Sequence, residues 1–321
     1  MSMTPAPLYI DGEAAAHLLD PASVLRVVER ALVELAEKRL VNGVKGGFSL
    51  DDGNGCRHMG AISGCDVAAN MVGVKWFAAV DANSRRGLPR VPATILLCDA
   101  ITGLLTGVID ATSLTAVRTA ALAIAAIRPC VGTRLRKATI VGFGPIGQAV
   151  ARYLPQQFDV GEIVVASRGG AAHKTAPSLT VESRLDRAIT DADLVVTATG
   201  LSANTPLVDA AWLKPGATVC ALGSYQEIDG RIVAGADRIF VDNWEACRQR
   251  GNLAPVIQSG ALARSAVTGA FADLVAGKLA ARASADQTVL LVSVGIGALD
   301  IALGAELLKQ ARIQGVGQPL G

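Results

Sequence analysis

The sequence is poor in charged residues. Asp, Glu, Lys and Arg make up 18% of its 321 residues, whereas 51% are hydrophobic. This balance excludes a disordered chain and indicates extensive burial, inside the fold or between subunits, so we expect an oligomer. The formal net charge is only +2 and the Lys and Arg residues are scattered. The charge pattern therefore predicts no nucleic acid and no membrane surface as partner, and favours a small molecule.

The sequence also lacks the cysteine patterns of disulfide-bonded and zinc-binding proteins. No C-x-x-C pair and no regular spacing connects its six cysteines, Cys56, Cys65, Cys98, Cys130, Cys220 and Cys247. They indicate reduced thiols in a cytoplasmic protein. Cys56, His58 and Cys65 lack a fourth ligand at a usual zinc spacing, so we expect no metal.

Targeting and membrane-spanning segments are not apparent either. The first residues, MSMTPAPLYIDGE, contain no basic region followed by an apolar one, so we expect no signal peptide. The longest apolar stretch, residues 289–308, contains Asp300, Glu306 and three glycines. It predicts a strand, a glycine turn and a buried helix rather than a membrane span.

The first part of the chain predicts a mixed or antiparallel sheet with helices. Residues 20–39 place apolar side chains at three- and four-residue intervals behind an Asp-Pro start, which indicates a capped amphipathic helix. Residues 73–80 and 93–100 are short apolar runs typical of strands, and the second continues through Thr102-Gly103 into 104–110 as in a hairpin. Residues 113–129 then indicate a long, very apolar helix.

From Leu135 onward, apolar strands alternate with helices, which is typical of a parallel sheet covered on both faces. A last amphipathic helix over residues 298–310 could return to the first domain. At this length we expect two domains. At least six parallel strands are predicted, at residues 137–144, 162–168, 192–200, 217–224, 237–243 and 288–295.

A glycine motif opens this second part. Gly142, Gly144 and Gly147, with Phe143, Pro145 and Ile146 between them, follow an apolar strand and precede a helix. In that context G-x-G-x-x-G indicates a dinucleotide site, because the glycines allow a tight turn and a close approach of backbone to pyrophosphate at a helix N-terminus. The alternative is a glycine turn without a ligand.

The next strand end bears on the choice of cofactor. NAD-specific proteins usually carry an acid there for the adenosine ribose, but this chain has Ser167 and Arg168. A hydroxyl and a guanidinium can bind a 2′-phosphate, so NADPH is favoured, with NADH possible. Alternatively, Arg168 is only an exposed loop cation. Thr199, Gly223 and Ser224, at the ends of later strands, complete the expected cofactor site.

The order of several segments resembles the ornithine cyclodeaminase and mu-crystallin family. They are VGVKWF, LPRVPATILLCDAITG, TSLTAVRTAA, GFGPIGQ, LKPGATVCALGS and SVGIGALD, and they cover nearly the whole chain. The resemblance implies a substrate-binding and dimerisation domain from residues 1–118 and 299–321, a Rossmann domain over 119–298, and a homodimer joined through the substrate domains. The expected fold class is therefore α/β, a doubly wound Rossmann-type parallel sheet plus a mixed α+β domain from both chain ends.

The resemblance also implies that Lys75 and Arg118 hold the substrate's carboxylate beside the nicotinamide. The residues agree with this role, because a lysine in an apolar strand and an arginine in an apolar helix each need a buried anion or a solvent outlet. We expect the substrate, not a protein acid, as the partner of Arg118; the alternative for each cation is a structural ion pair. Lys45 stands near the position where the family often has another carboxylate-binding arginine, although lysine lacks the bidentate fork of arginine.

Two departures from the cyclodeaminases bear on the reaction. Ser224 and Tyr225 stand in the segment where those enzymes carry a catalytic aspartate. Two residues before Met59, where they can place a glutamate facing the substrate's distal amine, this chain has Arg57, which would repel an ornithine ammonium. Both departures suit a substrate without a free distal amine.

The family's ketimine reductases act on such substrates. The resemblance thus predicts NADPH-dependent reduction of Δ1-pyrroline-2-carboxylate or Δ1-piperideine-2-carboxylate to L-proline or L-pipecolate. The imine nitrogen arrives protonated or receives its proton from Lys75 or a water. The alternatives are an ornithine cyclodeaminase, a linear imino-acid or alanine dehydrogenase, and a protein that binds NADPH and a small ligand without turnover. The intact glycine turn disfavours a purely structural oligomer.

Overall fold

The structure is a computed structural model that describes residues 6–51, 57–167, 179–201 and 203–320. The chain forms two compact units. Unit 1 comprises Met1–Arg118 and Ile296–Gly321, and unit 2 comprises Thr119–Gly295. The chain thus returns to unit 1 at Ile296, slightly before the predicted position 299.

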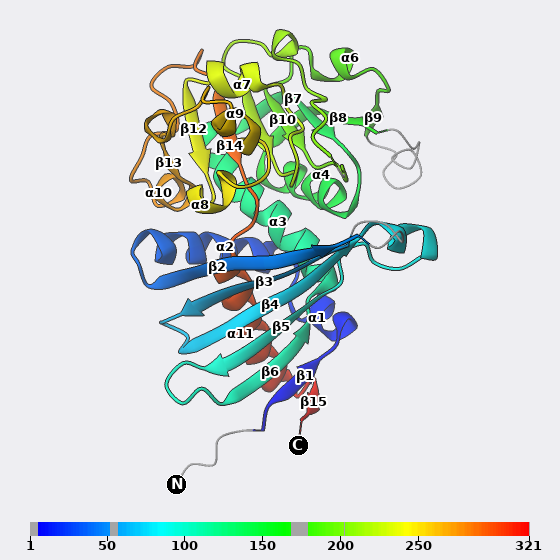
Figure 1. The fold of residues 1–321 in the computed structure, drawn as a ribbon, viewed down its shortest axis with the longest axis vertical. Coiled ribbons are helices and arrows are strands. Elements are labelled where there is room, and N and C mark those ends of the chain that lie inside the picture. Colours follow the sequence, from blue (N-terminus) through cyan, green and yellow to red (C-terminus); the bar gives the residue numbers. More distant parts are fainter. Residues whose placement is uncertain (1–5, 52–56, 168–178, 202, 321) are drawn as a thin grey trace. The chain divides into compact units, whose positions relative to one another are not determined.

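Unit 1 is built around a seven-stranded mixed sheet with the strand order β15-β1-β6-β5-β4-β3-β2 (Figure 1). Strands β2 to β6 pair antiparallel in sequence order, and β1 pairs parallel with β6. The β5–β6 hairpin confirms the sequence prediction. The strands are β1 (Leu8–Ile10), β2 (Leu40–Leu50), β3 (Arg57–Asp66), β4 (Met71–Val80), β5 (Ala93–Asp99), β6 (Leu105–Asp110) and β15 (Gln318–Pro319).

Two helices of unit 1, α1 and α2, begin with aspartate side-chain caps, and α11 packs on the sheet. The Asp20 side chain accepts a hydrogen bond from Ser23 N and Pro21 occupies the first turn of α2, so this helix starts where predicted. Residues of α11 pack on the sheet: a side chain on Gly297 would collide with Ile62 of β3. The helices are α1 (Gly12–Leu18), α2 (Pro21–Ala36), η1 (Asp81–Arg86), the start of α3 (Thr112–Ile127) and α11 (Gly297–Gln314).

Helix α11 differs from the prediction of an amphipathic helix. Its residues from Gly297 to Leu308 are buried except Glu306, which is half-buried. The helix has sheet on one side and α2 and α1 near it. It is therefore a core helix of unit 1, as the earlier reading of the 289–308 stretch predicted.

Unit 2 contains a parallel sheet with the order β13-β12-β14-β11-β10-β7-β8-β9. All six strands predicted from the sequence are present, and each pairs parallel with its neighbours. The strands are β7 (Arg134–Val141), β8 (Asp159–Ala166), β9 (Thr180–Val181), β10 (Leu194–Thr197), β11 (Thr218–Ala221), β12 (Arg238–Val241), β13 (Gly269–Ala270) and β14 (Val289–Val292).

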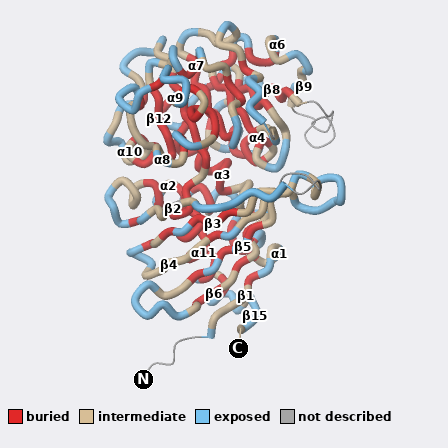
Figure 2. The backbone as a smooth tube through the Cα atoms, in the orientation of Figure 1, coloured by how far each residue is buried: buried red, intermediate tan, exposed pale blue. Residues whose placement is uncertain are grey.

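The centre of this sheet is buried on both faces. Every residue of β10, β11 and β14 is buried, and Figure 2 shows much of the tube in the middle of unit 2 in red. Such burial requires helices on both faces, so the sheet is doubly wound. The shorter helices of unit 2 are η2 (Arg128–Cys130), α4 (Pro145–Gln157), α6 (Leu185–Ile189), η3 (Ala210–Trp212), α7 (Gly230–Gly235), α8 (Trp244–Cys247), α9 (Ala254–Gln258), η4 (Arg264–Ala266) and α10 (Phe271–Val275).

Candidate functional site

The glycine motif forms the turn between β7 and α4. Gly142 has φ of 95°, a left-handed conformation that favours glycine, and a Cβ there would lie 2.6 Å from the Ala198 carbonyl oxygen. A Cβ on Gly147 would lie 2.3 Å from the carbonyl oxygen of Gly142, so only glycine lets the helix approach the strand. Two of the three glycines are therefore needed for the turn itself.

The third glycine, Gly144, has a different surrounding. A Cβ at this position would meet no atom within 4 Å among the described residues. Gly144 is the N-cap of α4, Pro145 opens the helix, and the first turn carries no acidic residue. Open space before a helix N-terminus with its exposed N–H groups fits a pyrophosphate. The residues around the turn thus fit a dinucleotide.

The strand ends beside this turn carry the remaining predicted cofactor residues. Ser167 directly follows β8. Arg168 lies outside the described residues. Thr199 follows β10, and Gly223 and Ser224 follow β11, at the same carboxyl edge of the parallel sheet as Gly142. Ligands of open parallel sheets bind at this edge.

A buried acid that the sequence interpretation missed joins these strand ends. Glu227 accepts hydrogen bonds from Thr197 Oγ1 at 2.5 Å, Thr199 N at 2.8 Å and Gly223 N at 2.9 Å, and from the Thr199 hydroxyl. Burial raises the pKa of the Glu227 carboxyl, and the hydrogen bonds from Thr197 and Thr199 oppose that rise. A Cβ on Gly223 would lie 2.2 Å from Cδ of Glu227, so Gly223 makes room for this acid.

Unit 1 holds a cluster of three buried charges. Lys75 on β4 is 2% exposed, Arg118 on α3 is 4% exposed and Asp300 on α11 is 1% exposed. The Lys75 Nζ lies 2.8 Å from Asp300 Oδ2, and the Arg118 Nε lies 3.0 Å from Asp300 Oδ1. We call these three residues the buried triad. Its members come from both ends of the chain because α11 crosses the sheet of unit 1.

The triad corrects the expectation that Arg118 has only a substrate as partner, because the carboxylate of Asp300 forms ion pairs with both Arg118 and Lys75. The expectation that Arg118 also binds a substrate carboxylate remains a prediction. The guanidinium is nevertheless incompletely used: its Nη1 is buried and has no hydrogen-bond partner among the described residues. A buried donor without a partner is costly, so Nη1 indicates a place for an anion.

Burial dominates the electrostatics of the triad. The pKa of Lys75 is lowered from 10.5 to about 8: desolvation by burial is the largest cause, the positive charge of Arg118 adds to it, and the ion pair with Asp300 opposes both effects. The Lys75 ammonium is consequently poised to lose its proton near neutral pH.

The strand register places a third cation on the face of Lys75. Lys45 pairs with Ile62 and Ile62 with Lys75, and directly paired residues share one face of a sheet. The Lys45 Nζ lies 5.6 Å from the ring centroid of Phe77, two residues along the same face of β4. The sheet thus brings Lys45 and Lys75 to one face, and Asp300 joins Arg118 of α3 to Lys75.

The same register corrects the interpretation of Arg57. This residue pairs with Val80, and its position in β3 alternates with that of Ile62, so Arg57 belongs to the opposite face from Lys75. Arg57 therefore gives no argument about a substrate amine. His58 stands on the Lys75 face, with its Nδ1 3.1 Å from Ser49 Oγ and its ring 5.9 Å from that of Phe77.

Alternation also separates two of the three residues considered as metal ligands. His58 and Cys65 occupy opposite faces of β3. Cys56 lies outside the described residues. No group of three His, Cys, Asp or Glu suited to a metal ion occurs in the part of the chain that the structure describes.

The segment that departs from the cyclodeaminases lies at the surface of unit 2. Tyr225 is 36% exposed, and the Ser224 carbonyl accepts a hydrogen bond from Gly251 N at 3.1 Å. The nearby buried carboxylate is Glu227, and its oxygens already accept hydrogen bonds from the two strand ends.

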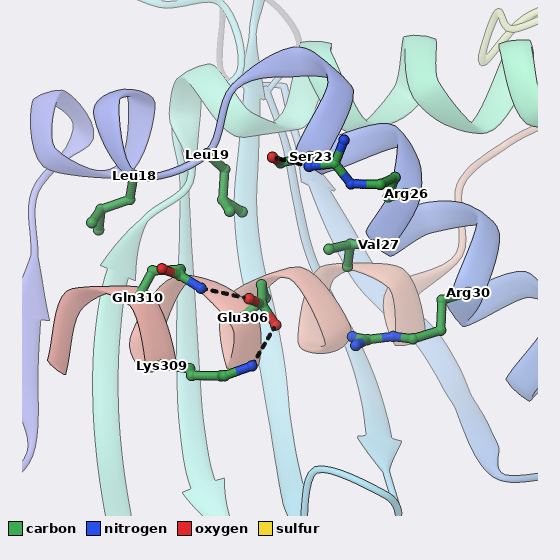
Figure 3. A pocket seen from close by; sticks show the side chains of 9 residues that line it. All are labelled: Leu18, Leu19, Ser23, Arg26, Val27, Arg30, Glu306, Lys309 and Gln310. Atoms are coloured by element: carbon green, nitrogen blue, oxygen red, sulfur yellow. Dashed lines mark hydrogen bonds and ion pairs between the residues drawn. The ribbon is translucent and has the colours of Figure 1, made fainter. Parts of the chain in front are cut away.

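An open cleft of ≈ 430 Å³ lies elsewhere on unit 1, between α2 and α11 (Figure 3). Arg26 and Arg30 line one wall, and Glu306 on the other is bound to Lys309 and Gln310. No predicted site residue is among its lining residues. The acid of this cleft is already paired.

The two units define a two-part α/β protein in which a Rossmann-type sheet accompanies a mixed α+β unit. Over residues 16–312 the sequence matches the model of the ornithine cyclodeaminase/mu-crystallin family. The chain belongs to this family.

Individual relatives are distant but match along most of the chain. A Δ1-pyrroline-2-carboxylate reductase of Bacillus thuringiensis is 23% identical over 98% of this chain and 99% of its own length. An alanine dehydrogenase of Archaeoglobus fulgidus is 26% identical over 77% of this chain and 79% of its own. The structure of Thermococcus litoralis Δ1-pyrroline-2-carboxylate reductase with NADH and L-proline superposes with a TM-score of 0.91, at 21% identity, over 98% of this chain and 100% of that one. The fold is therefore shared.

Across the described residues, no helix has the length and apolar character needed to cross a bilayer.

Proposed function

We propose that the protein reduces a cyclic imino acid, Δ1-pyrroline-2-carboxylate or Δ1-piperideine-2-carboxylate, to L-proline or L-pipecolate with NADPH. The observation that carries the proposal is the buried, unpartnered Nη1 of Arg118 beside Lys75, in a chain whose other unit has a dinucleotide-type glycine turn. The B. thuringiensis and T. litoralis relatives, both named as Δ1-pyrroline-2-carboxylate reductases, support it.

The first step is binding of the substrate's carboxylate. Arg118 Nη1 can donate a charge-assisted hydrogen bond to it, and Lys75 and Lys45 add positive charge on the same face. The apolar neighbours Ile62 and Ile95 flank Lys75 on the adjacent strands and exclude water from this region. A fixed carboxylate orients the ring for reaction.

The second step needs one hydride and one proton. When bound, the nicotinamide supplies the hydride to the imine carbon. The imine nitrogen must carry a proton so that the C=N double bond becomes a CH–NH single bond. Lys75 can donate this proton, because a pKa of about 8 leaves its ammonium both populated and acidic near neutral pH.

The cofactor preference rests on the strand end after β8. No acid follows β8 where NAD-specific proteins usually carry one, and Ser167 and Arg168 can bind a 2′-phosphate. The T. litoralis structure contains NADH, so both cofactors belong in the assay.

We also propose that the protein is a homodimer. The sheet face of unit 1 opposite Lys75 exposes Phe48 (53%), Trp76 (46%) and Leu96 (39%), and the Phe48 and Trp76 rings lie 6.5 Å apart. Contiguous apolar surface of this kind is typical of an interface. We propose that a second copy of the chain covers this face and that unit 1 is the substrate-binding and dimerisation domain.

The decisive experiment is a substrate panel followed by NADPH absorbance. The purified protein is mixed with each cyclic imine, with the linear imines formed from pyruvate or glyoxylate and amines, and with L-ornithine plus NAD⁺. We expect rapid NADPH oxidation with at least one cyclic imine. Turnover of linear imines alone would favour an alanine-dehydrogenase-like enzyme, ammonia release from ornithine a cyclodeaminase, and tight NADPH binding without turnover a binding protein.

A further inference from the structure

The buried triad contains more than the proposed reaction uses. Lys75 and Arg118 have roles toward the substrate, but Asp300 contacts both of them and is 1% exposed. Burying a carboxylate is costly unless it is paired. Because Asp300 separates two cations that would otherwise repel each other, its position determines how both of them meet the substrate.

We propose that Asp300 is the positioning residue of this site: it divides its carboxylate between Lys75 and Arg118, keeps Lys75 protonated when substrate binds, and directs Nη1 of Arg118 toward one substrate carboxylate. This inference rests on the proposed function and deepens it. Asp300 acts through the two cations and does not itself touch the reacting atoms.

The net charge of the buried triad matches one substrate carboxylate. With all three groups ionised the triad carries a net charge of +1, which one substrate carboxylate neutralises. In the free protein Lys75 has one acid, Asp300, and one cation, Arg118, beside it. When the substrate carboxylate arrives, Lys75 has two anions beside it, so its pKa must rise and the ammonium is held for proton donation.

The other groups that face Lys75 do not supply this effect. Ile62 of β3 and Ile95 of β5, which pair directly with Lys75, are uncharged. Lys45 of β2, whose Nζ lies 5.6 Å from the Phe77 ring centroid, and His58 of β3 share the face, but a positive charge on either would favour loss of the proton. Among the described residues, Asp300 is the acid in contact with Lys75.

Replacing Asp300 by Asn removes the charge and keeps the shape. In Asp300→Asn the substrate carboxylate only restores the environment that Lys75 has in the wild-type free protein. The pH dependence of kcat/KM reports the free protein, in which Asp300→Asn leaves Lys75 beside Arg118 without its acid. We therefore expect kcat/KM for the cyclic imine to fall at a pH at least about one unit lower than in the wild type. With a wild-type pKa of about 8, a decrease of one unit should lower kcat/KM about fivefold at pH 8 and close to tenfold at pH 9, and should change it little at pH 6.

Three comparisons separate positioning from mere structural support. The same imine is used throughout, so its own titration cancels between variants. Glu306→Gln, an acid-to-amide change in a half-buried residue of the same helix, should leave the pH profile unchanged. Asp300→Glu keeps the charge but displaces it, so the pH profile should stay as in the wild type while KM rises. If Asp300→Asn does not fold, an unchanged KM in Asp300→Glu would overturn the proposal.

A binding experiment keeps this inference separate from the proposed reaction. Pyrrole-2-carboxylate, a planar ring carboxylate, is titrated calorimetrically into the protein with bound NADP⁺ in buffers of different ionisation enthalpy. The wild type should take up a proton on binding near pH 8 to 9, and Asp300→Asn should show that uptake at lower pH. This result in a protein that reduces no imine would refute the reaction and retain the role of Asp300. The proposed role of Asp300 would be overturned if the pH dependence of proton uptake, and that of kcat/KM, were each the same in Asp300→Asn as in the wild type.

Discussion

Replacing Lys75 by Met should abolish imine reduction and yet make the protein more stable. The Lys75 ammonium is held inside unit 1 at 2% exposure, and burial lowers its pKa from 10.5 to about 8 despite the ion pair with Asp300. This difference means that keeping Lys75 charged in the folded state costs about 3 kcal/mol. Met fills a similar volume without a charge, and Asp300 keeps Arg118 as its partner.

The sign of the pH dependence follows from the protons bound. Below pH 8 Lys75 is charged in both the folded and unfolded states, so the full cost applies. Between about pH 8 and 10.5 the unfolded chain binds more protons than the folded one, so this group makes the free energy of unfolding rise with pH. Lys75→Met should therefore gain about 1 to 3 kcal/mol at pH 7 and much less at pH 10.

Urea denaturation at both pH values measures this directly. Lys309→Met, a change at an exposed lysine of α11, is the matched control and should shift stability by less than about 0.5 kcal/mol. If Lys75→Met is less stable than the wild type at pH 7, or if its stability difference does not depend on pH, the reasoning about the cost of the buried ammonium is wrong.

Four further changes test the other parts of the proposal. Arg118→Ala should lower kcat/KM by about thirty- to a thousandfold, because a charged hydrogen bond to the substrate is lost, and a fully active variant would remove Arg118 from the site. Arg168→Ala should raise KM for NADPH and leave KM for NADH almost unchanged; equal effects would refute phosphate binding. Tyr225→Phe should retain most reductase activity, and a loss of several orders of magnitude would show that its hydroxyl is needed. If the wild type forms the proposed dimer in sedimentation equilibrium, Trp76→Glu should be a monomer, and an unchanged dimer mass would place the interface elsewhere.

Unit 2 could largely be predicted from the sequence. Its strands are continuous apolar runs because both sheet faces are buried, and such runs stand out against the helices between them. The glycine turn is recognisable because Gly142 and Gly147 are required by local backbone geometry. In this unit, the residues that the local backbone requires and the pattern of apolar residues both indicate the same fold.

Unit 1 was harder to predict because the position of its functional side chains depends on how the β-strands pair. Strands β2 and β3 contain glycines and polar residues and show no clear alternation, so neither was expected. The face on which Arg57 lies follows from the register with β4, which the sequence alone does not reveal. The single charged residue in the apolar stretch 289–305 was the available signal for Asp300, the same kind of signal that drew attention to Lys75 and Arg118.

The fate of the cofactor's hydride gives the most direct test of the proposed reaction. NADPH carrying two deuterium atoms at C4 of the nicotinamide is incubated with the protein and Δ1-pyrroline-2-carboxylate, and the product is analysed by mass spectrometry and NMR. The proposal predicts L-proline with one deuterium at Cα, formed in equal amount to the NADPH consumed. Recovery of unchanged NADPH, or of proline without deuterium at Cα, would contradict it.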